Sequence, residues 1–501
     1  MVSLSKSVLS SICVSLLASS VNALIPIEVV GKRFVKPAPK EGDDGEVFFI
    51  KGVDYMPGGA SGYSSNSKSD VLSDADACMR DAYLLQKLGA NTIRIYSINP
   101  DVNHDECMSI FNSAGIYVIL DVNSSDQGEY LDRENPASTY NGQYLKNVFK
   151  RIEAFKNFPN LLGFFAGNEV INDQGSSVEK APAYVRAVQR DMKQYIAKHA
   201  DRTIPVGYSA AEIDDLRAAT YEYFQCNIDG DEKDESKSDF YGVNSYSWCS
   251  GSSNWGSSGY SKVNSTFQDT SIPVFFSEYG CNKNTPRTFD EVSEGVYSGL
   301  IDTLSGGLIY EFSEEANHYG LVELDTDGSA TLQDDYDNLQ SQYNKTEIPD
   351  ISESDVEDPT LATCNSTYIQ SLYKGFGNFT LPDQPDEVTD MINSGLNSTN
   401  VGKLVDFDNS PSNYTITDAD GNEISDASIS INPTATINEQ QTTAVPTEAS
   451  TTKSASATAN AASSSNSSSA SSSSKGAAAG NIEINAGGLM FMLGVGISAL
   501  L

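Results

Sequence analysis

The sequence contains few histidines and few basic residues, and these shortages exclude several classes of protein. It has three histidines and neither an HExxH nor a GxSxG motif, so a zinc protease or a Ser-His-Asp hydrolase is not expected. It has 32 Lys and Arg residues and 68 Asp and Glu residues, which gives a formal net charge of −36. Because binding to nucleic acid or anionic lipid requires clustered positive charge, the preferred substrate should be neutral or cationic. Catalysis by carboxylates is the chemistry that remains.

Sequence patterns for metals and dinucleotides are missing as well. No CxxC spacing indicates a metal site, and no GxGxxG follows an apolar run, so neither a metal nor a cofactor is expected. Of the seven cysteines, Cys13 lies in an apolar N-terminal stretch, and the others form an even set. In an oxidising compartment this set allows up to three disulfides, and about 15 connectivities are open from spacing alone.

The N-terminal segment is typical of a secretory signal. Lys6 precedes an apolar stretch at residues 8–17, and small residues follow, closing with Ala23. This order predicts a signal peptide at residues 1–23 and a mature chain that starts at Leu24.

The C-terminal segment is apolar but shorter than the roughly 20 residues of a membrane span. Residues 486–501 carry no charge, and small residues, Gly476 first among them, lie a polar spacer upstream. This layout predicts a GPI anchor at Gly476 and a propeptide, residues 477–501, that is removed. The alternative is a true membrane helix, which the short length and the missing basic flank disfavour.

Composition divides the chain between these signals into three parts. Residues 24–345 are rich in aromatic side chains and mixed in pattern. Residues 346–441 are acidic and weakly periodic, and we predict a glycosylated extension tied to the preceding domain through Cys364. Residues 442–476 are mostly Ser, Thr, Ala and Asn, which predicts a disordered, O-glycosylated stalk. N-glycosylation sequons, which need the secretory route, lie at Asn264, Asn344, Asn365, Asn378, Asn397 and Asn413, and another lies at Asn123.

Short apolar runs alternate with amphipathic stretches through the first part, as expected for βα units around a parallel sheet. Helix-like segments such as residues 75–88 and 183–199 lie between the runs. We therefore predict an α/β fold, a (β/α)8 TIM barrel, over residues 24–345. A doubly wound sheet is the alternative, and the missing glycine motif disfavours it. The eight predicted strands are residues 48–53, 92–96, 117–121, 161–167, 204–208, 240–244, 274–277 and 307–310.

Two glutamates directly follow predicted strands. Glu169 comes after the fourth apolar run and Glu278 after the seventh, and a TIM barrel places its chemistry at these strand ends. Retaining cleavage of a glycosidic bond uses two carboxyl groups about 5 to 5.5 Å apart, one as acid/base and one as nucleophile. The alternative is that both are solvated loop acids or ion-pair partners, as most acidic residues in this chain must be. Their placement at strand ends favours a catalytic pair.

Five motifs, in order along the chain, carry a family resemblance. They are Gly52-Val53-Asp54-Tyr55, Arg94-Ile95-Tyr96-Ser97, Gly167-Asn168-Glu169-Val170, Asn244-Ser245-Tyr246-Ser247-Trp248-Cys249 and Ser277-Glu278-Tyr279-Gly280. Together they resemble the fungal GPI-anchored β-1,3-glucanosyltransferases of glycoside hydrolase family 72 over about residues 24–344. The resemblance implies a clan-A barrel in which Glu169 is the acid/base and Glu278 the nucleophile.

The resemblance also implies the reaction. Such an enzyme cleaves β-1,3-glucan internally by double displacement and transfers the new reducing end to the 3-hydroxyl at the non-reducing end of another glucan, which elongates cell-wall glucan. The expected protein is a monomer at the cell surface, held to the plasma membrane only by its lipid, and it binds a glucan donor and a glucan acceptor. Two alternatives stay open: a retaining endo-β-1,3-glucanase that uses water, and a non-catalytic wall-binding protein, which would be expected to lack one carboxylate.

Further positions follow from the resemblance one at a time. Asn168 resembles the residue that binds the sugar 2-hydroxyl, and Tyr246 the tyrosine that orients the nucleophile. The substrate-binding residues implied are Tyr96, Asn123, Asp132, Asn168, Glu212, Arg217, Tyr246, Tyr310 and Tyr319. The implied disulfides are Cys78–Cys107, Cys226–Cys364 and Cys249–Cys281.

The sequence departs from the family pattern in three places. Glu212 stands where many relatives have Asp, and Met56 stands where a Gln is common. Only Cys364 follows the barrel, so the chain resembles the form without a Cys-rich carbohydrate-binding module. These departures fall where they would influence which glucan is bound.

Overall fold

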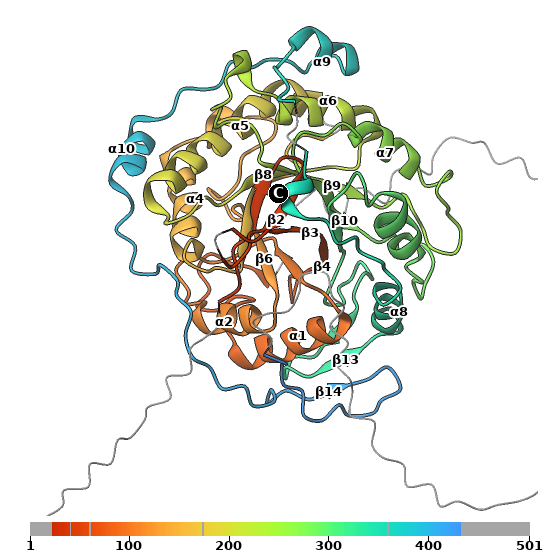
Figure 1. Cartoon of the computed structure of the whole chain (residues 1–501). Helices are drawn as coiled ribbons and strands as arrows, with labels where there is room; N and C mark the ends of the chain where they lie inside the picture. The colour runs from red at the N-terminus through yellow and green to blue at the C-terminus, as the bar shows by residue number, and fades with distance from the viewer. Residues whose placement is uncertain (1–22, 41, 60–61, 173–174, 358–359, 432–501) are drawn as a thin grey trace, which may run out of the picture. The chain divides into compact units, whose positions relative to one another are not determined.

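A closed barrel of eight parallel strands is the centre of the computed structural model, which describes residues 23–40, 42–59, 62–172, 175–357 and 360–431. Neighbouring strands follow one another around the ring, and the last pairs with the first (Figure 1). The closed ring confirms the predicted TIM barrel and excludes a doubly wound sheet. The strands are β4 (Ile50–Asp54), β5 (Thr92–Ile95), β6 (Tyr117–Asp121), β7 (Leu161–Asn168), β8 (Val206–Ala210), β9 (Phe240–Ser245), β10 (Val274–Tyr279) and β11 (Gly306–Ile309).

The predicted strands match the observed ones closely, because each barrel strand is buried on both faces and therefore reads as a continuous apolar run. β6 has the predicted bounds. β8 starts two residues later than predicted, at Val206, since Pro205 cannot donate a ladder hydrogen bond. β7 and β10 extend past their predicted ends, and they carry their polar C-terminal residues into the strand.

Helices surround the barrel (Figure 1). The helix α1 (Ala75–Leu88) has the predicted bounds: the Asp74 side chain accepts from the first backbone N–H groups, and Gly89, at a φ of 86°, ends it. The other helices of the ring are α2 (Asp105–Ser113), α4 (Gly142–Phe155), α5 (Gly175–His199), α6 (Asp214–Gln225), α7 (Tyr260–Phe267), the π-helix η3 (Glu291–Gly299) and α8 (Asp334–Tyr343).

A small antiparallel sheet closes the N-terminal end of the barrel, a feature that the sequence did not predict. It consists of β1 (Glu28–Val30), β2 (Arg33–Lys36) and β3 (Glu46–Phe48). From β2, the Phe34 ring lies 5.7 Å from that of Phe240 and 5.8 Å from that of Phe275, residues at the beginnings of barrel strands. This aromatic cluster fills the floor of the barrel, so only the opposite end is left as a mouth.

Residues 378–430, which we call the belt, pack along the outside of the barrel helices. The belt contains α10 (Asp386–Ser394), whose Val388 and Ile392 are buried. Its backbone bonds to side chains of three ring helices: Leu396 N–H donates to Tyr195 Oη, Val405 N–H to Ser109 Oγ and Ser430 N–H to Gln86 Oε1. The extension is therefore attached along much of its length, and the predicted tie through Cys364 is one of several attachments. The remaining short elements are α3 (Pro136–Thr139), η2 (Ile228–Gly230), β12 (Val322–Leu324), β13 (Ala330–Leu332), η4 (Glu353–Asp355), α9 (Ser366–Leu372) and β14 (Ile416–Thr417).

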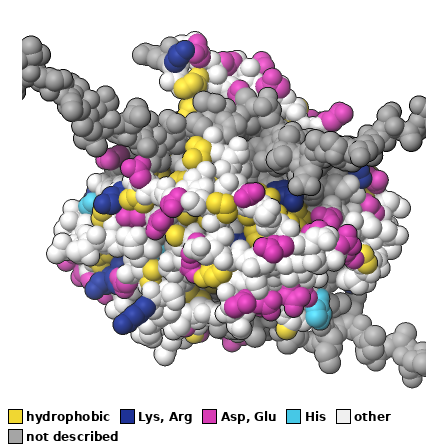
Figure 2. Space-filling model, turned by 90° about the horizontal axis from the view of Figure 1, so that it is seen from below, with side chains coloured by type: hydrophobic (Ala, Val, Ile, Leu, Met, Phe, Trp, Pro, Cys, Tyr) yellow, Lys and Arg dark blue, Asp and Glu magenta, His cyan; other side chains and the backbone are white. Residues whose placement is uncertain are grey.

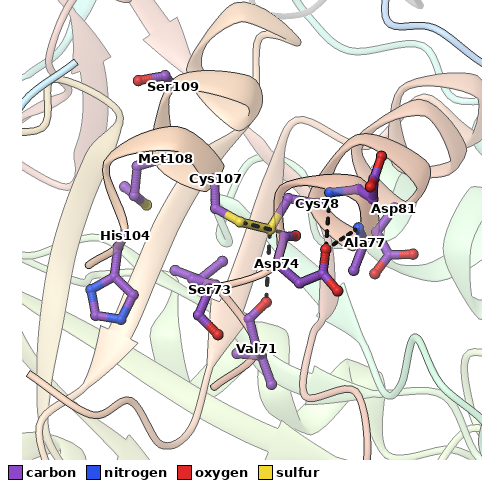
Figure 3. The surroundings of a disulfide bond; sticks show 12 residues. Val71, Ser73, Asp74, Ala77, Cys78, Asp81, His104, Cys107, Met108 and Ser109 are labelled. Atoms are coloured by element: carbon purple, nitrogen blue, oxygen red, sulfur yellow. Dashed lines mark hydrogen bonds between the residues drawn. A yellow bond between two sulfur atoms is a disulfide. The ribbon is translucent and has the colours of Figure 1, made fainter. Parts of the chain in front are cut away.

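Three disulfides confirm the implied pairing: Cys78–Cys107, Cys226–Cys364 and Cys249–Cys281. The first joins α1 to α2 next to the Asp74 cap (Figure 3). The second joins the end of α6 to the segment that leads into the belt. The third joins two loops at the mouth of the barrel.

The surface reflects the acidic composition. On the face shown in Figure 2, Asp and Glu side chains are widely distributed and Lys and Arg side chains form only small groups. No helix among the described residues has the length and apolar character needed to cross a membrane. The signal peptide, apart from residue 23, the stalk at 442–476, the Gly476 anchor and the propeptide lie outside the described residues.

Candidate active site

Backbone irregularities aim both glutamates into the mouth. The pairing of β7 with β8 shifts register between Phe165 and Asn168, and Glu169 follows with a φ of 48°. The pairing of β10 with β9 shifts between Phe276 and Glu278. Bulges of this kind turn a side chain away from the regular in-and-out alternation of a strand. Both predicted glutamates therefore turn their side chains out of the regular alternation, at strand ends that face the open side of the barrel.

Two donors hold the Glu278 carboxylate in one orientation. The Tyr246 hydroxyl donates to Oε2 at 2.7 Å, and Arg94 Nη1 donates to Oε1 at 3.2 Å. Glu278 is 2% exposed, so water cannot replace these donors without a change in the surrounding packing. Each oxygen keeps a lone pair free of these bonds, which a reacting atom can use.

Glu169 lies in a different environment. Asn244 Nδ2 donates to its Oε1 at 2.8 Å, and its backbone N–H donates to Ser209 O. Burial, and then the negative charge of Glu278, raise the pKa of the Glu169 carboxyl to about 7. Two carboxyl groups whose surroundings differ in this way are suited to different roles, one as an acid and one as a base or nucleophile.

Asn244 orients the Glu169 carboxyl and is itself fixed by hydroxyl groups. Ser277 Oγ donates to Asn244 Oδ1 at 2.8 Å and Ser209 Oγ does so at 3.3 Å, which turns the amide nitrogen toward the glutamate. The same nitrogen lies 3.5 Å from Asn168 Oδ1. The Asn244 amide thus contacts both Asn168, a predicted site residue, and Glu169.

Arg94 is the buried cation of the site. Its Nε and Nη2 donate to the two carboxylate oxygens of Asp121 at 3.2 and 2.8 Å, while Nη1 reaches Glu278. Its guanidinium lies 4.3 Å from the centre of the Tyr96 ring. Burial raises the pKa of Asp121 to about 6 and that of Asp54 well above its usual range, although Arg94 opposes both shifts. One guanidinium therefore provides the positive charge that stabilises the ionised forms of several buried carboxyl groups.

Four of the predicted tyrosines lie together as an aromatic wall beside Glu278. The ring centres of Tyr310 and Tyr319 are 5.2 Å apart, and Tyr246 lies 6.1 and 5.6 Å from them. Tyr96 lies 6.3 Å from Tyr310. Ring faces and hydroxyl groups in this arrangement suit the alternating apolar and polar surface of a pyranose.

Glu212 belongs to the same region. It accepts from Ser245 Oγ at 3.1 Å, next to Tyr246, and burial raises its pKa.

Two predicted residues make local contacts instead. Asp132 Oδ1 accepts from the backbone N–H groups of Glu134 and Asn135 and so shapes its own loop. Arg217 pairs with Asp214 at 2.7 Å on α6. In the described part of the chain, no hydrogen bond joins either residue to Glu169 or Glu278, and their contact with substrate stays a prediction.

Sequence reasoning did not assign functions to Arg94, Asp121, Asn244 or Asp54. All four lie at C-terminal ends of barrel strands, which is the same signal that identified the glutamates. The signal was present, but apolar runs alone do not say which strand-end residues meet across the barrel.

The sequon at Asn123 is expected to stay unglycosylated. Asn123 Nδ2, the atom that a glycan would modify, donates to Ala166 O at 3.0 Å, and Oδ1 accepts from the Tyr144 hydroxyl at 2.7 Å. Asn123 is 5% exposed, whereas Asn378 and Asn397 are exposed on the extension. Peptide mass spectrometry of the secreted protein should find Asn123 unmodified and at least one of the exposed sites occupied. A glycan on Asn123 would contradict this packing.

The barrel, with glutamates at the ends of β7 and β10, defines an enzyme fold of the glycoside hydrolase clan-A type. Comparison with known proteins agrees: residues 16–347 match the glycoside hydrolase family 72 profile, described as glucanosyltransferase. The chain belongs to this family.

Its relatives are fungal. The probable 1,3-beta-glucanosyltransferase GAS3 of Saccharomyces cerevisiae is 56% identical over 452 residues, which cover 88% of this chain and 86% of the relative. The 1,3-beta-glucanosyltransferase gel2 of Aspergillus fumigatus is 52% identical over 418 residues, covering 83% and 85%. Among solved structures, a Saccharomyces cerevisiae Gas2p mutant in complex with laminaritetraose and laminaripentaose is 37% identical, with a TM-score of 0.62, and the match covers 73% of this chain and 76% of that one.

Proposed function

We propose that this chain is a retaining β-1,3-glucanosyltransferase in which Glu278 is the nucleophile and Glu169 the acid/base. The observation that carries the proposal is the difference between the two carboxyl groups. Glu278 is oriented by Tyr246 and Arg94, whereas burial and the charge of Glu278 raise the pKa of Glu169 to about 7. The names of the relatives, and the laminari-oligosaccharides bound by Gas2p, support β-1,3-glucan as the substrate.

In the first step, Glu278 attacks the anomeric carbon while protonated Glu169 donates its proton to the departing oxygen. The fragment on the reducing side leaves, and a glucosyl ester forms on Glu278. The ester is neutral, so the negative charge that helps to raise the pKa of Glu169 disappears. Glu169 is then a stronger acid, stays ionised, and can act as the base in the second step.

In the second step, Glu169 takes a proton from the incoming hydroxyl, which attacks the ester and restores Glu278. If that hydroxyl is the 3-hydroxyl at the non-reducing end of a second glucan, the chain is elongated. The aromatic wall supports this outcome, because it offers ring faces, those of Tyr246, Tyr310 and Tyr319 among them, on which an acceptor sugar can lie in preference to water.

Product length tests the proposal. The secreted protein is incubated with a reduced laminari-oligosaccharide, and the products are separated by size. Products longer than the starting chain support transfer. Shorter products alone would identify an endo-β-1,3-glucanase, and no products at all would support the wall-binding alternative.

The pH dependence of kcat/KM is expected to show a basic limb near pH 7. Glu169 must be protonated when the glycosidic bond breaks, and its pKa is about 7, so the active fraction falls about tenfold for each pH unit above that value. Initial rates measured across the neutral range check this. A rate that stays constant well into the alkaline range would exclude Glu169 as the acid.

The sequence signals support a placement for the enzyme. We propose that the mature protein starts at Leu24, acts as a monomer and is held at the cell surface by a GPI lipid on Gly476, with residues 442–476 as a spacer. Release of activity from intact cells by a phosphatidylinositol-specific phospholipase would support this, and retention of all activity would oppose it.

A further inference from the structure

The loop that follows β9, residues 246–259, is fixed to the rest of the protein at two places close to Tyr246. We call it the Tyr246 loop. Tyr246 is its first residue and donates the 2.7 Å hydrogen bond to Glu278 Oε2. The end of β9 and the neighbouring tyrosines hold the Tyr246 ring from one side, and the position of its hydroxyl depends further on whatever holds the loop.

The first attachment is the Cys249–Cys281 disulfide. Cys249 follows Tyr246 by three residues, and Cys281 follows Glu278 by the same number. The disulfide therefore joins the segment that carries the donor to the segment that carries the acceptor.

The second attachment is centred on Ser250, the next residue. The backbone N–H of Asp290 donates to Ser250 Oγ at 2.9 Å, and Ser250 Oγ donates in turn to the Glu291 carboxylate. Asp290 Oδ2 accepts from the backbone N–H of Gly251 at 2.9 Å, and Asn284 Nδ2 donates to Ser250 O at 2.7 Å. Ser250 is thus bound through its hydroxyl and its carbonyl, and both attachments lie within five residues of Tyr246.

Glu291 is the buried anchor of this second attachment. It is completely buried at the start of η3, where burial raises the pKa of its carboxyl to about 7. The same helix supports the Tyr246 loop at another point, because Gly295 packs against Trp248 of the loop and against Tyr260 at the start of α7. No hydrogen bond or ion pair of the described residues links Glu291 to Glu169 or Glu278, so its hydrogen-bonded connection to the site is through Ser250 and the loop.

We propose that Glu291 is a positioning residue that holds Tyr246 against the nucleophile through Ser250 and the Tyr246 loop. The inference rests on the proposed function, since it assigns Glu291 a part in that reaction. It distinguishes Glu291 from buried acids that serve only the fold.

A double-mutant cycle with Tyr246 tests the proposal. Glu291→Ala should lower kcat for laminari-oligosaccharide by about ten- to a hundredfold with little change in KM, because a displaced donor weakens the transition state and not substrate binding. Glu291→Gln keeps an acceptor for Ser250 and should restore most of kcat. In a Tyr246→Phe background, Glu291→Ala should lower kcat only slightly further, since the hydroxyl that Glu291 positions is already absent.

Glu153 provides the matched control. It is also a buried glutamate that accepts from a hydroxyl, that of Tyr195 at 2.7 Å, but it lies on α4. Glu153→Ala should lower the Tm in a comparable way and leave kcat near the wild-type value. Ser250→Ala, a smaller change, takes the place of Glu291→Ala in the cycle if the latter fails to fold.

Additive losses in the Tyr246→Phe background, or equal losses of kcat in the Glu291 and Glu153 variants, would overturn the proposal. Failure of the proposed function looks different, because the wild-type protein itself would then form no elongated products. Non-additive losses confined to the Glu291 and Ser250 variants support the positioning role.

Discussion

Turnover of β-1,3-glucan is expected to fall by about 10⁴-fold or more when Glu278 is replaced by Gln, because the amide cannot form the glucosyl ester. The substitution keeps the shape of the side chain and its contact with the Tyr246 hydroxyl, so the fold should persist. Initial rates on a laminari-oligosaccharide, together with a thermal unfolding curve, measure both consequences.

Glu169→Gln should show a different defect, and the difference separates the two roles. General acid catalysis contributes about 10²- to 10⁴-fold, so the loss on natural glucan should lie in that range. A phenolic leaving group departs without needing a proton. With a donor that carries such a group, the Glu169→Gln variant should therefore still form the glucosyl ester. The ester should accumulate and be visible by intact-protein mass spectrometry. Glu278→Gln should form no ester from either donor.

Glu323→Gln is the control for both variants. Glu323 is exposed on β12, and its substitution should leave rates unchanged. If the Glu169 and Glu278 variants both kept full turnover, the proposed mechanism would be wrong. If ester accumulated on the Glu278 variant, another nucleophile would have to be sought.

Replacement of Arg94 by Met is expected to destabilise the protein by about 3–5 kcal/mol and to abolish turnover. Arg94 is fully buried, donates to both oxygens of Asp121 and pairs with Glu278 at 3.2 Å. Without the guanidinium, two buried carboxylates lose their only close cation among the described residues. Urea unfolding at neutral pH measures the loss of free energy.

The destabilisation should depend on pH with a defined sign. In the Arg94→Met variant, the folded-state pKa of Asp121, which burial raises to about 6 even beside Arg94, lies above its unfolded value, so folding penalises the ionised form. The loss of stability should therefore be smallest in acid and grow as pH rises through neutrality. Arg94→Met combined with Asp121→Asn removes this charge and should recover part of the loss. An unfolding midpoint equal to that of wild type would show that the ion cluster does not stabilise the fold.

Local sequence was sufficient to predict the barrel and the position of both glutamates at strand ends. Each barrel strand is a continuous apolar run, and Glu169 and Glu278 follow such runs directly, so a rule that uses only neighbouring residues found them. The disulfides and the aromatic residues came from resemblance to a family, because spacing alone left the cysteine pairing open.

Contacts between residues distant in the chain cannot be predicted from neighbouring residues alone. The Arg94–Asp121 pair and the Ser250–Glu291 bond join strand ends or loops from different βα units, and no periodicity marks them. The floor sheet β1–β3 was missed because its strands are only three or four residues long, too short to show a periodic pattern, and they become buried only against a barrel that already exists.

The floor sheet has a kinetic consequence. With one end of the barrel filled by Phe34 and its aromatic neighbours, both glucans must use the same face of the protein. In the proposed mechanism, the departing oxygen and the incoming hydroxyl each need the place beside Glu169, so the second glucan would enter only after the first fragment has left. Donor and acceptor should therefore take turns, and double-reciprocal plots at several acceptor concentrations should be parallel lines, as in a ping-pong mechanism.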